Sequence, residues 1–255
     1  MNKMFNLTHK VAVVIGGSGG IGSAQAIELA DAGADVVVVD LAINKLDQVV
    51  NKIREKGRKS SGIVADITQE RPVQEMVEKV LTEFSHIDIL VNAAGISIRK
   101  PAIGFPIDDW QQVIDVNTRG TFICCKFVGE VMIKQKSGKI INLSSVRGRY
   151  GLKVFQAAYC PSKGAVDALT RTLACEWARY NVLVNAIAPC VVQTDFTSSA
   201  LSDPEVARNL KAQIPLGRWA MPEDIVGLTV FLASKASDFI TGQIIYIDGG
   251  MTACL

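Results

Sequence analysis

The stretch Val11-Ala12-Val13-Val14-Ile15-Gly16-Gly17-Ser18-Gly19-Gly20-Ile21-Gly22 decides the fold that we expect for this chain. Its first five residues are apolar and mostly β-branched, which is typical of a strand buried on both faces of a sheet. Glycines follow where the chain must turn tightly, and a helical pattern then runs over 21–32 and ends before Gly33. A strand, a glycine-rich turn and a helix in this order predict the start of a βαβ unit.

The same alternation continues along the rest of the chain. Short runs rich in Val and Ile predict strands over 11–15, 36–39, 63–65, 87–91, 140–143, 182–187 and 244–247. Helical spacing returns over 71–84, 109–133 and 159–180. Because strand–helix–strand crossovers are right-handed, such repeats produce a parallel sheet covered on both faces. We therefore predict an α/β doubly wound (Rossmann) fold with a seven-stranded parallel sheet.

The domain organisation is expected to be simple. No Pro-rich or Ser-rich linker divides the chain, so 1–255 is predicted to be a single domain. The least regular stretch is 190–216, which contains two prolines and a polar helical pattern near 205–212. A long loop in a compact enzyme is often a lid, and we predict a substrate lid here. A variable surface loop is the alternative.

The composition excludes several classes of function. Hydrophobic residues make up 49% of the chain, charged residues 20%, and the net charge is +2. This charge offers no basic field for nucleic acid, and no apolar run reaches the roughly 18 residues that span a membrane. The first ten residues are too polar for a secretory signal, which favours the cytoplasm. The six cysteines and two histidines form no metal-binding motif, so we expect free thiols and no metal.

The glycine-rich turn predicts a binding site for a dinucleotide. Glycines allow the backbone to approach a pyrophosphate, and the following helix offers unpaired N–H donors and a partial positive charge. Asp40 ends the second strand, where a carboxylate accepts hydrogen bonds from the ribose of NAD and repels the 2′-phosphate of NADP. No Arg or Lys lies in the turn or directly after Asp40, so we predict NAD. The alternative for Asp40 is a turn residue or a helix cap.

A phenol and an ammonium group are predicted to share one face of a helix. Tyr159 and Lys163 are four positions apart, and a neighbouring cation lowers the pKa of a phenol from its usual value of about 10. Such a phenol can exchange a proton with a substrate oxygen. Ser144 and Ser145 follow the fifth strand, at the sheet edge where ligands bind. Either hydroxyl could hold that oxygen, and strand termination is the alternative role.

Together these motifs resemble the short-chain dehydrogenase/reductase family over essentially the whole chain. The matching residues are Gly16, Gly20, Ile21, Gly22, Asp66, Asn92, Ala93, Ala94, Gly95, Asn117, Ser144, Ser145, Tyr159, Lys163, Asn185, Pro189, Thr194, Asp248, Gly249 and Gly250. The resemblance implies an NAD-dependent oxidoreductase that moves a hydride between the nicotinamide and a secondary alcohol or ketone. The cofactor then carries the hydride, while the protein supplies position and proton transfer.

The resemblance also implies a role for each matching residue. Tyr159 would be the general acid/base, Lys163 would lower its pKa and bind the nicotinamide ribose, and Ser145 would orient the substrate oxygen. Asn117 would help to hold a water of the proton relay. The implied cofactor-binding residues are Gly16, Ser18, Gly19, Gly20, Ile21, Gly22, Asp40, Leu41, Asp66, Ile67, Asn92, Ala93, Ala94, Gly95, Tyr159, Lys163, Pro189, Val192 and Thr194. The implied substrate-binding residues are Ser145, Arg147, Ile98, Phe155, Tyr159 and Cys190.

Three features depart from the family pattern. Ile15 stands where the family usually has Thr, and Cys190 stands where Gly is usual. The spacing from Ser145 to Tyr159 is 14 residues, one more than the commonest pattern. An extra residue within 147–156 would absorb this difference, and otherwise Ser144 takes the place of Ser145.

The substrate is predicted only as a class. Further pocket candidates are Ile96, Arg99, Tyr150, Val154, Val191, Phe196 and Trp219. The basic residues Arg99, Lys100, Arg147, Arg149 and Lys153 could meet a carboxylate, although solvated surface charge is the favoured interpretation. Segments 95–101 and 145–151 resemble those of gluconate dehydrogenases and 3-oxoacyl carrier-protein reductases. Asp40 favours a polyol, sugar or sugar acid oxidised with NAD.

Two other functions remain open at this point. One is an NADP-linked 3-oxoacyl or carbonyl reductase, and the other is a nucleotide-binding sensor without catalysis. Family members are mostly tetramers, and a homotetramer is expected here too. The segment 118–132 supports it, because it carries more apolar surface than one sheet face needs: Phe122, Ile123, Phe127, Val128 and Val131.

Overall fold

The computed structural model describes residues 3–151 and 155–254. They contain one parallel sheet of seven strands in the order β3-β2-β1-β4-β5-β6-β7, which confirms the predicted doubly wound fold. The strands are β1 Val11–Ile15, β2 Asp35–Asp40, β3 Ser60–Val64, β4 Ile89–Asn92, β5 Gly138–Leu143, β6 Val182–Pro189 and β7 Ile244–Ile247. The order reverses between β1 and β4, and a ligand crevice is expected where this happens in such folds.

The helices are more numerous than the sequence pattern indicated. They are α1 Gly20–Asp31, α2 Ile43–Glu55, α3 Glu70–Phe84, α4 Ile107–Ile114, α5 Thr121–Gln135, α6 Tyr159–Trp177, α7 Asp195–Leu201, α8 Pro204–Lys211 and α9 Pro222–Ala233. The predicted helix over 109–133 exists, but a π-helical segment, η2 Asp115–Gly120, joins α4 to α5. Helices α2, α7 and α9 were not predicted. Within the described residues, no helix has the length and apolar character needed to cross a bilayer.

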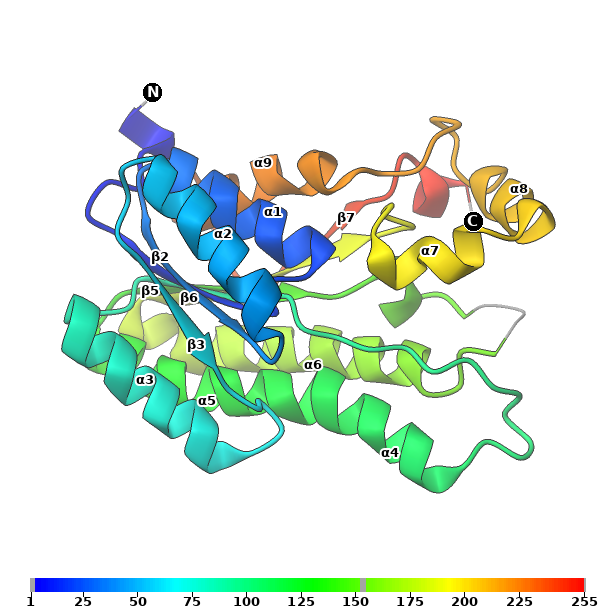
Figure 1. Cartoon of the computed structure of the whole chain (residues 1–255), viewed down its shortest axis with the longest axis horizontal. Helices are drawn as coiled ribbons and strands as arrows, with labels where there is room; N and C mark the ends of the chain where they lie inside the picture. Colours follow the sequence, from blue (N-terminus) through cyan, green and yellow to red (C-terminus); the bar gives the residue numbers. More distant parts are fainter. Residues whose placement is uncertain (1–2, 152–154, 255) are drawn as a thin grey trace.

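Two helical layers enclose the sheet (Figure 1). Helices α1, α2 and α9 pack on one face, and α3, α5 and α6 pack on the other. Along β1, Val13 and Ile15 join the core under α3, α5 and α6, whereas Ala12 and Val14 join the opposite core. Because both faces of β1 are buried, every residue of the strand is apolar.

The turn after β1 brings three distant segments together. Gly16 has a φ of +71°, and a Cβ on it would lie 2.6 Å from the backbone nitrogen of Ala94. A Cβ on Gly20 would lie 2.5 Å from Cγ2 of Thr194. Glycine is therefore required at both positions, since the backbone must pass close to the ends of β4 and β6.

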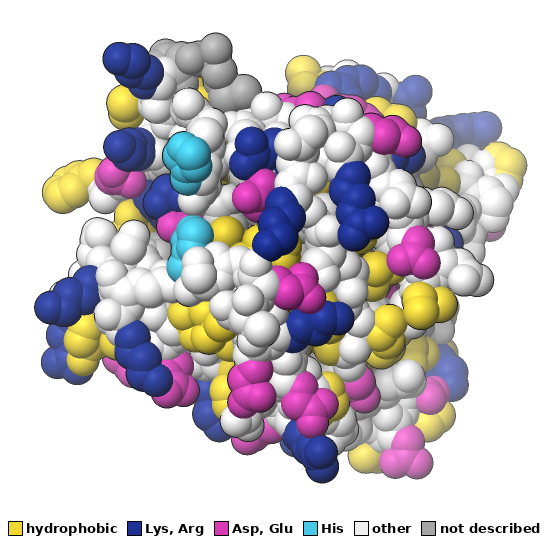
Figure 2. Space-filling view, turned by 60° about the vertical axis from the view of Figure 1, so that its left-hand side comes forward, with side chains coloured by type: hydrophobic (Ala, Val, Ile, Leu, Met, Phe, Trp, Pro, Cys, Tyr) yellow, Lys and Arg dark blue, Asp and Glu magenta, His cyan; other side chains and the backbone are white. Residues whose placement is uncertain are grey.

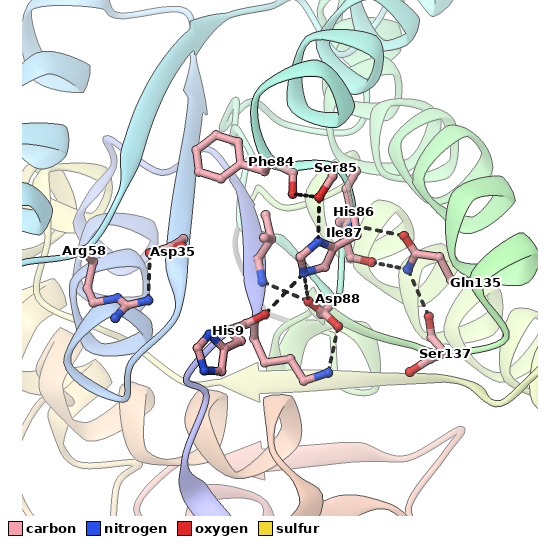
Figure 3. A network of polar contacts seen from close by, with 12 residues as sticks. His9, Asp35, Arg58, Phe84, Ser85, His86, Ile87, Asp88, Gln135 and Ser137 are labelled. Carbon is pink, nitrogen blue, oxygen red and sulfur yellow. Dashed lines mark hydrogen bonds and ion pairs between the residues drawn. The ribbon is translucent and has the colours of Figure 1, made fainter.

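Polar contacts fasten the opposite, amino end of the sheet (Figure 3). The Asp88 carboxylate accepts a hydrogen bond from the Val11 backbone N–H at 2.9 Å and pairs with the Lys10 ammonium at 2.8 Å. His86 Nε2 lies 3.0 Å from Asp88 Oδ2, the oxygen that also accepts from Val11, whereas Lys10 pairs with Oδ1. Both oxygens are thus occupied, and they hold the start of β1 against the segment that leads into β4.

Candidate active site

A cleft of about 550 Å³ lies at the carboxyl edge of the sheet. The turns after six strands, β1 to β6, contribute to its lining. Among the predicted site residues the cleft is lined by Gly16, Ser18, Gly19, Gly20, Ile21, Gly22, Asp40, Leu41, Asp66, Ile67, Ala93, Ala94, Gly95, Ser145, Tyr159, Lys163, Pro189, Cys190, Val192 and Thr194. The structure therefore brings most of the expected cofactor and catalytic residues to one place.

Asp40 ties the end of β2 to the glycine-rich turn. Its carboxylate accepts hydrogen bonds from the backbone N–H groups of Ser18 at 3.0 Å and Leu41 at 2.7 Å. These bonds orient the side chain at the cleft, and a carboxylate has further acceptor sites for a ligand hydroxyl. Lys45 of α2 also lines the cleft, where it pairs with the exposed Asp195 at 2.9 Å. Lys45 was missed because helix α2 was not predicted.

Two other turns at the cleft are held by their own side chains. The Asp66 carboxylate accepts hydrogen bonds from the backbone and the hydroxyl of Thr68, at 2.9 and 2.7 Å. Thr194 caps helix α7 in a reciprocal arrangement with Thr197. The N–H groups in the first turn of α1 have no acceptor within their own helix, so they remain donors for an anionic ligand. This cradle fits the pyrophosphate and ribose of a dinucleotide.

The departure at Ile15 is compensated by the backbone. Ile15 ends β1 with a buried side chain, and the turn after it is braced by hydrogen bonds from the N–H groups of Gly16 and Gly17 to the Val39 carbonyl, at 2.8 and 3.1 Å. Cys190 lines the cleft, and its own N–H donates to the Ile247 carbonyl at 3.2 Å.

Tyr159 and Lys163 occupy the first turns of α6. The Lys163 ammonium lies 5.8 Å from the centre of the Tyr159 ring and donates a hydrogen bond to the Leu143 carbonyl at 2.6 Å. Lys163 is only 4% exposed, and burial lowers its pKa to about 8. Burial also raises the pKa of Tyr159 to about 12, although a side-chain hydrogen bond with Ser145 acts in the opposite direction.

The expected lowering of the Tyr159 pKa is therefore wrong for this structure. Both groups are desolvated, and desolvation disfavours the charged form of each: the phenolate of Tyr159 and the ammonium of Lys163. The sequence prediction considered the attraction between the two charges and left out the larger effect of burial.

The two serines after β5 have different partners. Ser144 donates a short hydrogen bond to the Asp167 carboxylate, whereas Ser145 contacts Tyr159 and accepts the Arg147 backbone N–H at 3.1 Å. Ser145 is thus the serine beside the phenol, and the hydroxyl of Ser144 is occupied elsewhere. The loop 147–156 was expected to absorb the longer spacing, and its residues 152–154, including Lys153 and Val154, lie outside the described residues.

Three predicted site residues line neither this cleft nor the smaller hollow described below. Asn92 points into the core, where its amide donates to the Asn142 side chain at 2.9 Å. Asn117 is buried in the π-helical segment, and its amide donates to the Ile96 carbonyl and the Ser162 hydroxyl, both at 2.9 Å. Ile98 packs in a small apolar cluster with Phe105, Val113 and Ala158. These side chains support the site from behind, since they are occupied by the protein itself.

A smaller hollow of about 150 Å³ adjoins Tyr159 and shares Ser145, Cys190 and Phe196 with the cleft. The predicted residues that line it are Arg99, Arg147, Phe155 and Val191. Residues that were not predicted also line it, namely Ser97, Val146, Gln156, Thr197, Ala200, Val206 and Leu210. Ser97 stands between two residues that were predicted, and Val206 and Leu210 lie on one side of α8. Tyr150 and Trp219 line neither space.

Metal binding has no visible basis in the described parts of the chain. No group of three or more His, Cys, Asp or Glu side chains within 3–151 and 155–254 is placed to hold a metal ion. Cys124 and Cys125 are buried, and burial raises the pKa of the Cys125 thiol to about 12. None of the six cysteines, all of which lie within the described residues, forms a disulfide.

The glycine cradle, the carboxylate at its far end and the Tyr–Lys pair beside a pocket define a dinucleotide-dependent oxidoreductase. Comparisons with known proteins agree. The family model described as enoyl-(acyl carrier protein) reductase matches residues 16–252. A 2-dehydro-3-deoxy-D-gluconate 5-dehydrogenase from Dickeya dadantii is 40% identical over 251 residues, which are 98% of each chain. A 3-oxoacyl-[acyl-carrier-protein] reductase from Synechocystis is 40% identical over 250 residues, covering 97% of this chain and 99% of the other.

Solved structures give the same assignment. A gluconate 5-dehydrogenase from Burkholderia cenocepacia J2315 in complex with NADP and tartrate superimposes with a TM-score of 0.95 at 34% identity, over 99% of each chain. An NAD⁺-bound xylitol dehydrogenase has a TM-score of 0.92 at 35% identity, over 96% of this chain and 99% of the other. The chain belongs to the short-chain dehydrogenase/reductase family, and it is an NAD(P)-dependent oxidoreductase that acts on CH–OH groups.

Proposed function

We propose that this protein is an NAD-dependent dehydrogenase that oxidises a secondary alcohol of a polyol, a sugar or a sugar acid. One observation carries the proposal: Ser145, Tyr159 and Lys163 line the same cleft as the glycine-rich turn and Asp40. A dinucleotide held by that turn would extend along the cleft toward Tyr159. The similarity to dehydrogenases of keto-gluconates and polyols supports this class of substrate.

The residues of this chain divide the chemistry between binding and proton transfer. When bound, NAD supplies the hydride acceptor. The turn 16–22 would hold its pyrophosphate and Asp40 its adenosine ribose. Ser145 would orient the substrate hydroxyl, and Tyr159 Oη would take the proton as the carbinol carbon gives up its hydride. The Lys163 ammonium would stabilise the Tyr159 phenolate that accepts this proton.

Asp40 supports NAD rather than NADP. Its carboxylate is held at the cleft by two backbone bonds, and a 2′-phosphate beside it would meet a negative charge. Lys45 is the cation of the same region, and its ammonium already pairs with Asp195. The Burkholderia gluconate 5-dehydrogenase was solved with NADP, so the test below compares both cofactors.

A substrate panel with both cofactors tests the proposal. We expect NADH formation with polyols or sugar acids at a kcat/KM at least about tenfold higher with NAD than with NADP, because a repelled phosphate costs roughly 1.4 kcal/mol or more. Activity confined to 3-oxoacyl thioesters with NADPH would instead support the reductase alternative. Nucleotide binding without turnover of any alcohol or ketone would support the sensor.

We further propose that 190–216 acts as a substrate lid, that the protein works in the cytoplasm and that it assembles as a homotetramer. Helices α7 and α8 lie within 190–216 and contribute side chains to the hollow, which supports the lid. On α5, Ile123 and Val128 are buried in the protein's own core, whereas Phe122 remains 46% exposed. Phe122 supports a subunit contact on that helix.

A further inference from the structure

The hollow beside Tyr159 has two chemically different walls. The loops after β4 and β5 supply polar side chains from Ser97, Arg99, Arg147 and Gln156. The opposite wall is largely apolar and includes Ala200 of α7 and two residues of α8, Val206 and Leu210. A ligand that fits between them therefore needs polar groups along one side and can present carbon to the other.

Arg147 carries an unpaired positive charge into this hollow. Its side chain is half-buried, and no carboxylate in the described residues lies within ion-pair distance of it. Its guanidinium donates one long hydrogen bond, to the Gly151 carbonyl at 3.4 Å. Burial lowers the pKa of Arg147, and the groups that interact with its charge are Tyr159, Cys160 and Cys190. A partly desolvated cation without a counter-charge would be stabilised by an anionic ligand.

The same wall holds two buried oxygens without a hydrogen-bond partner among the described residues: Ser97 Oγ and Gln156 Oε1. Buried polar atoms are almost always bonded, so such atoms next to a pocket indicate a polar ligand. The hydroxyl of Ser97 can both donate and accept, and the amide oxygen of Gln156 accepts from a hydroxyl. Two groups of this kind suit a chain of alcohol groups.

We propose that this hollow recognises a polyhydroxy carboxylic acid, with Arg147 binding its carboxylate and Ser97 and Gln156 bonding its hydroxyls. The proposal rests on the proposed function and narrows its substrate from polyols, sugars and sugar acids to the acids. Arg147 is well placed for the role. Its backbone N–H donates to Ser145 Oγ at 3.1 Å, so the guanidinium and the residue that orients the reacting oxygen belong to one short turn.

Neutral polyols and long acyl chains would each leave some polar groups of this wall without a partner. A neutral polyol would leave the guanidinium without a counter-charge. A long acyl chain would pack on the apolar wall but would leave the oxygens of Ser97 and Gln156 unbonded. A sugar acid supplies a carboxylate for the guanidinium and hydroxyls for the two oxygens, so we prefer it.

Two substrates that differ only at C1 test the proposal: gluconate, and glucitol, in which the carboxylate is replaced by an uncharged CH₂OH. We expect Arg147→Met to lower kcat/KM for gluconate about 10- to 100-fold, mainly through KM, the usual scale for a charge-assisted bond. The value for glucitol should change less than about threefold. Arg147→Lys should recover part of the loss for gluconate, since it restores the charge without the bidentate geometry.

Arg149→Met is the matched control. Arg149 lies two residues along the same loop, stacks over the Tyr150 ring at 5.3 Å and lines neither space. This variant should leave both substrates unaffected. The KM for NAD and the Tm of each variant show whether the protein remains folded.

The outcomes separate the inference from the proposed function. Equal losses for gluconate and glucitol in Arg147→Met would overturn the inference, because Arg147 would then position Ser145 rather than bind the carboxylate. A wild-type enzyme that prefers glucitol to gluconate would also overturn it, while the dehydrogenase remains. If the wild type oxidises neither these compounds nor any other polyol or sugar acid, the proposed function itself fails.

Discussion

The two ends of the sheet use charged side chains in opposite ways. At the amino end the Asp88 carboxylate is 14% exposed and is saturated by Val11, Lys10 and His86 (Figure 3). At the carboxyl edge the half-buried Arg147 guanidinium has a single long bond. Figure 2 shows the side of the molecule that bears the N-terminus, where basic and acidic side chains are interspersed. The protein itself neutralises Asp88, which stabilises the fold, whereas Arg147, which we propose binds a ligand, keeps most of its hydrogen-bonding capacity.

The carboxyl edge also contains two buried groups whose pKa values are shifted. Burial shifts the pKa of Tyr159 upward and that of Lys163 downward, so the protein disfavours both charged forms. Such shifts are tolerated where a ligand or a reaction uses them, and they cost stability elsewhere. If the two ends act independently, a substitution at one end should leave the property of the other end unchanged.

The largest effect is expected from Tyr159→Phe. Removal of the general acid/base should lower kcat by about 10²- to 10⁴-fold and leave NAD affinity and Tm nearly unchanged. Steady-state kinetics and nucleotide titration measure the two effects. Tyr180→Phe is the control, because Tyr180 follows the other end of the α6 segment in η4 Ala178–Tyr180. A Tyr159→Phe enzyme with a near-normal rate would remove this residue from the mechanism.

A smaller effect, on stability alone, is expected at the amino end. Asp88→Ala leaves the Val11 N–H and the Lys10 ammonium without their acceptor and should lower the free energy of unfolding by about 2 kcal/mol. The Tm should fall by about 4–8 °C for a chain of this size, with kcat per folded molecule unchanged. Asp31→Ala removes an exposed pair with Lys56 and should cost less than about 0.5 kcal/mol. A loss of kcat in Asp88→Ala would show that the two ends are coupled.

The last prediction concerns the pH dependence of the two reaction directions, which needs no substitution. With the Tyr159 pKa raised to about 12, the phenol keeps its proton at neutral pH. Oxidation needs the phenolate, so its kcat/KM should rise by up to about tenfold per pH unit below pH 8. Above about pH 8 the slope should fall, because Lys163, with a pKa of about 8, loses its charge. Reduction needs the phenol and should stay flat between pH 6 and 8.

Initial rates in both directions across pH 6 to 9.5 measure this difference. A flat profile for oxidation would contradict the assignment of the proton acceptor to a buried phenol. The same profile measured on Tyr150→Phe should match the wild type, since Tyr150 lines neither the cleft nor the hollow.

The sequence pattern predicted some elements better than others. All seven strands were found, because each contains a short run of apolar residues between turn signals. Helix α2 was missed although Leu46, Val49 and Ile53 follow helical spacing, since most of its residues are polar and exposed. Helix α9 was missed for the opposite reason: it is largely apolar and shows little contrast between its faces. Because α2 was missed, its cleft-lining residue Lys45 was missed too.

The amino-acid sequence by itself determined the architecture, the glycine-rich turn and the Tyr–Lys spacing, because these depend on local periodicity and on the steric freedom of glycine. Only the tertiary structure decided which groups are desolvated and which have partners. It directed Ser144 to Asp167 and Ser145 to Tyr159, turned Asn92 and Asn117 into supports, and left Arg147 unpaired beside the pocket. Burial and pairing depend on segments far apart in the chain, and their order along the sequence does not reveal how closely those segments pack.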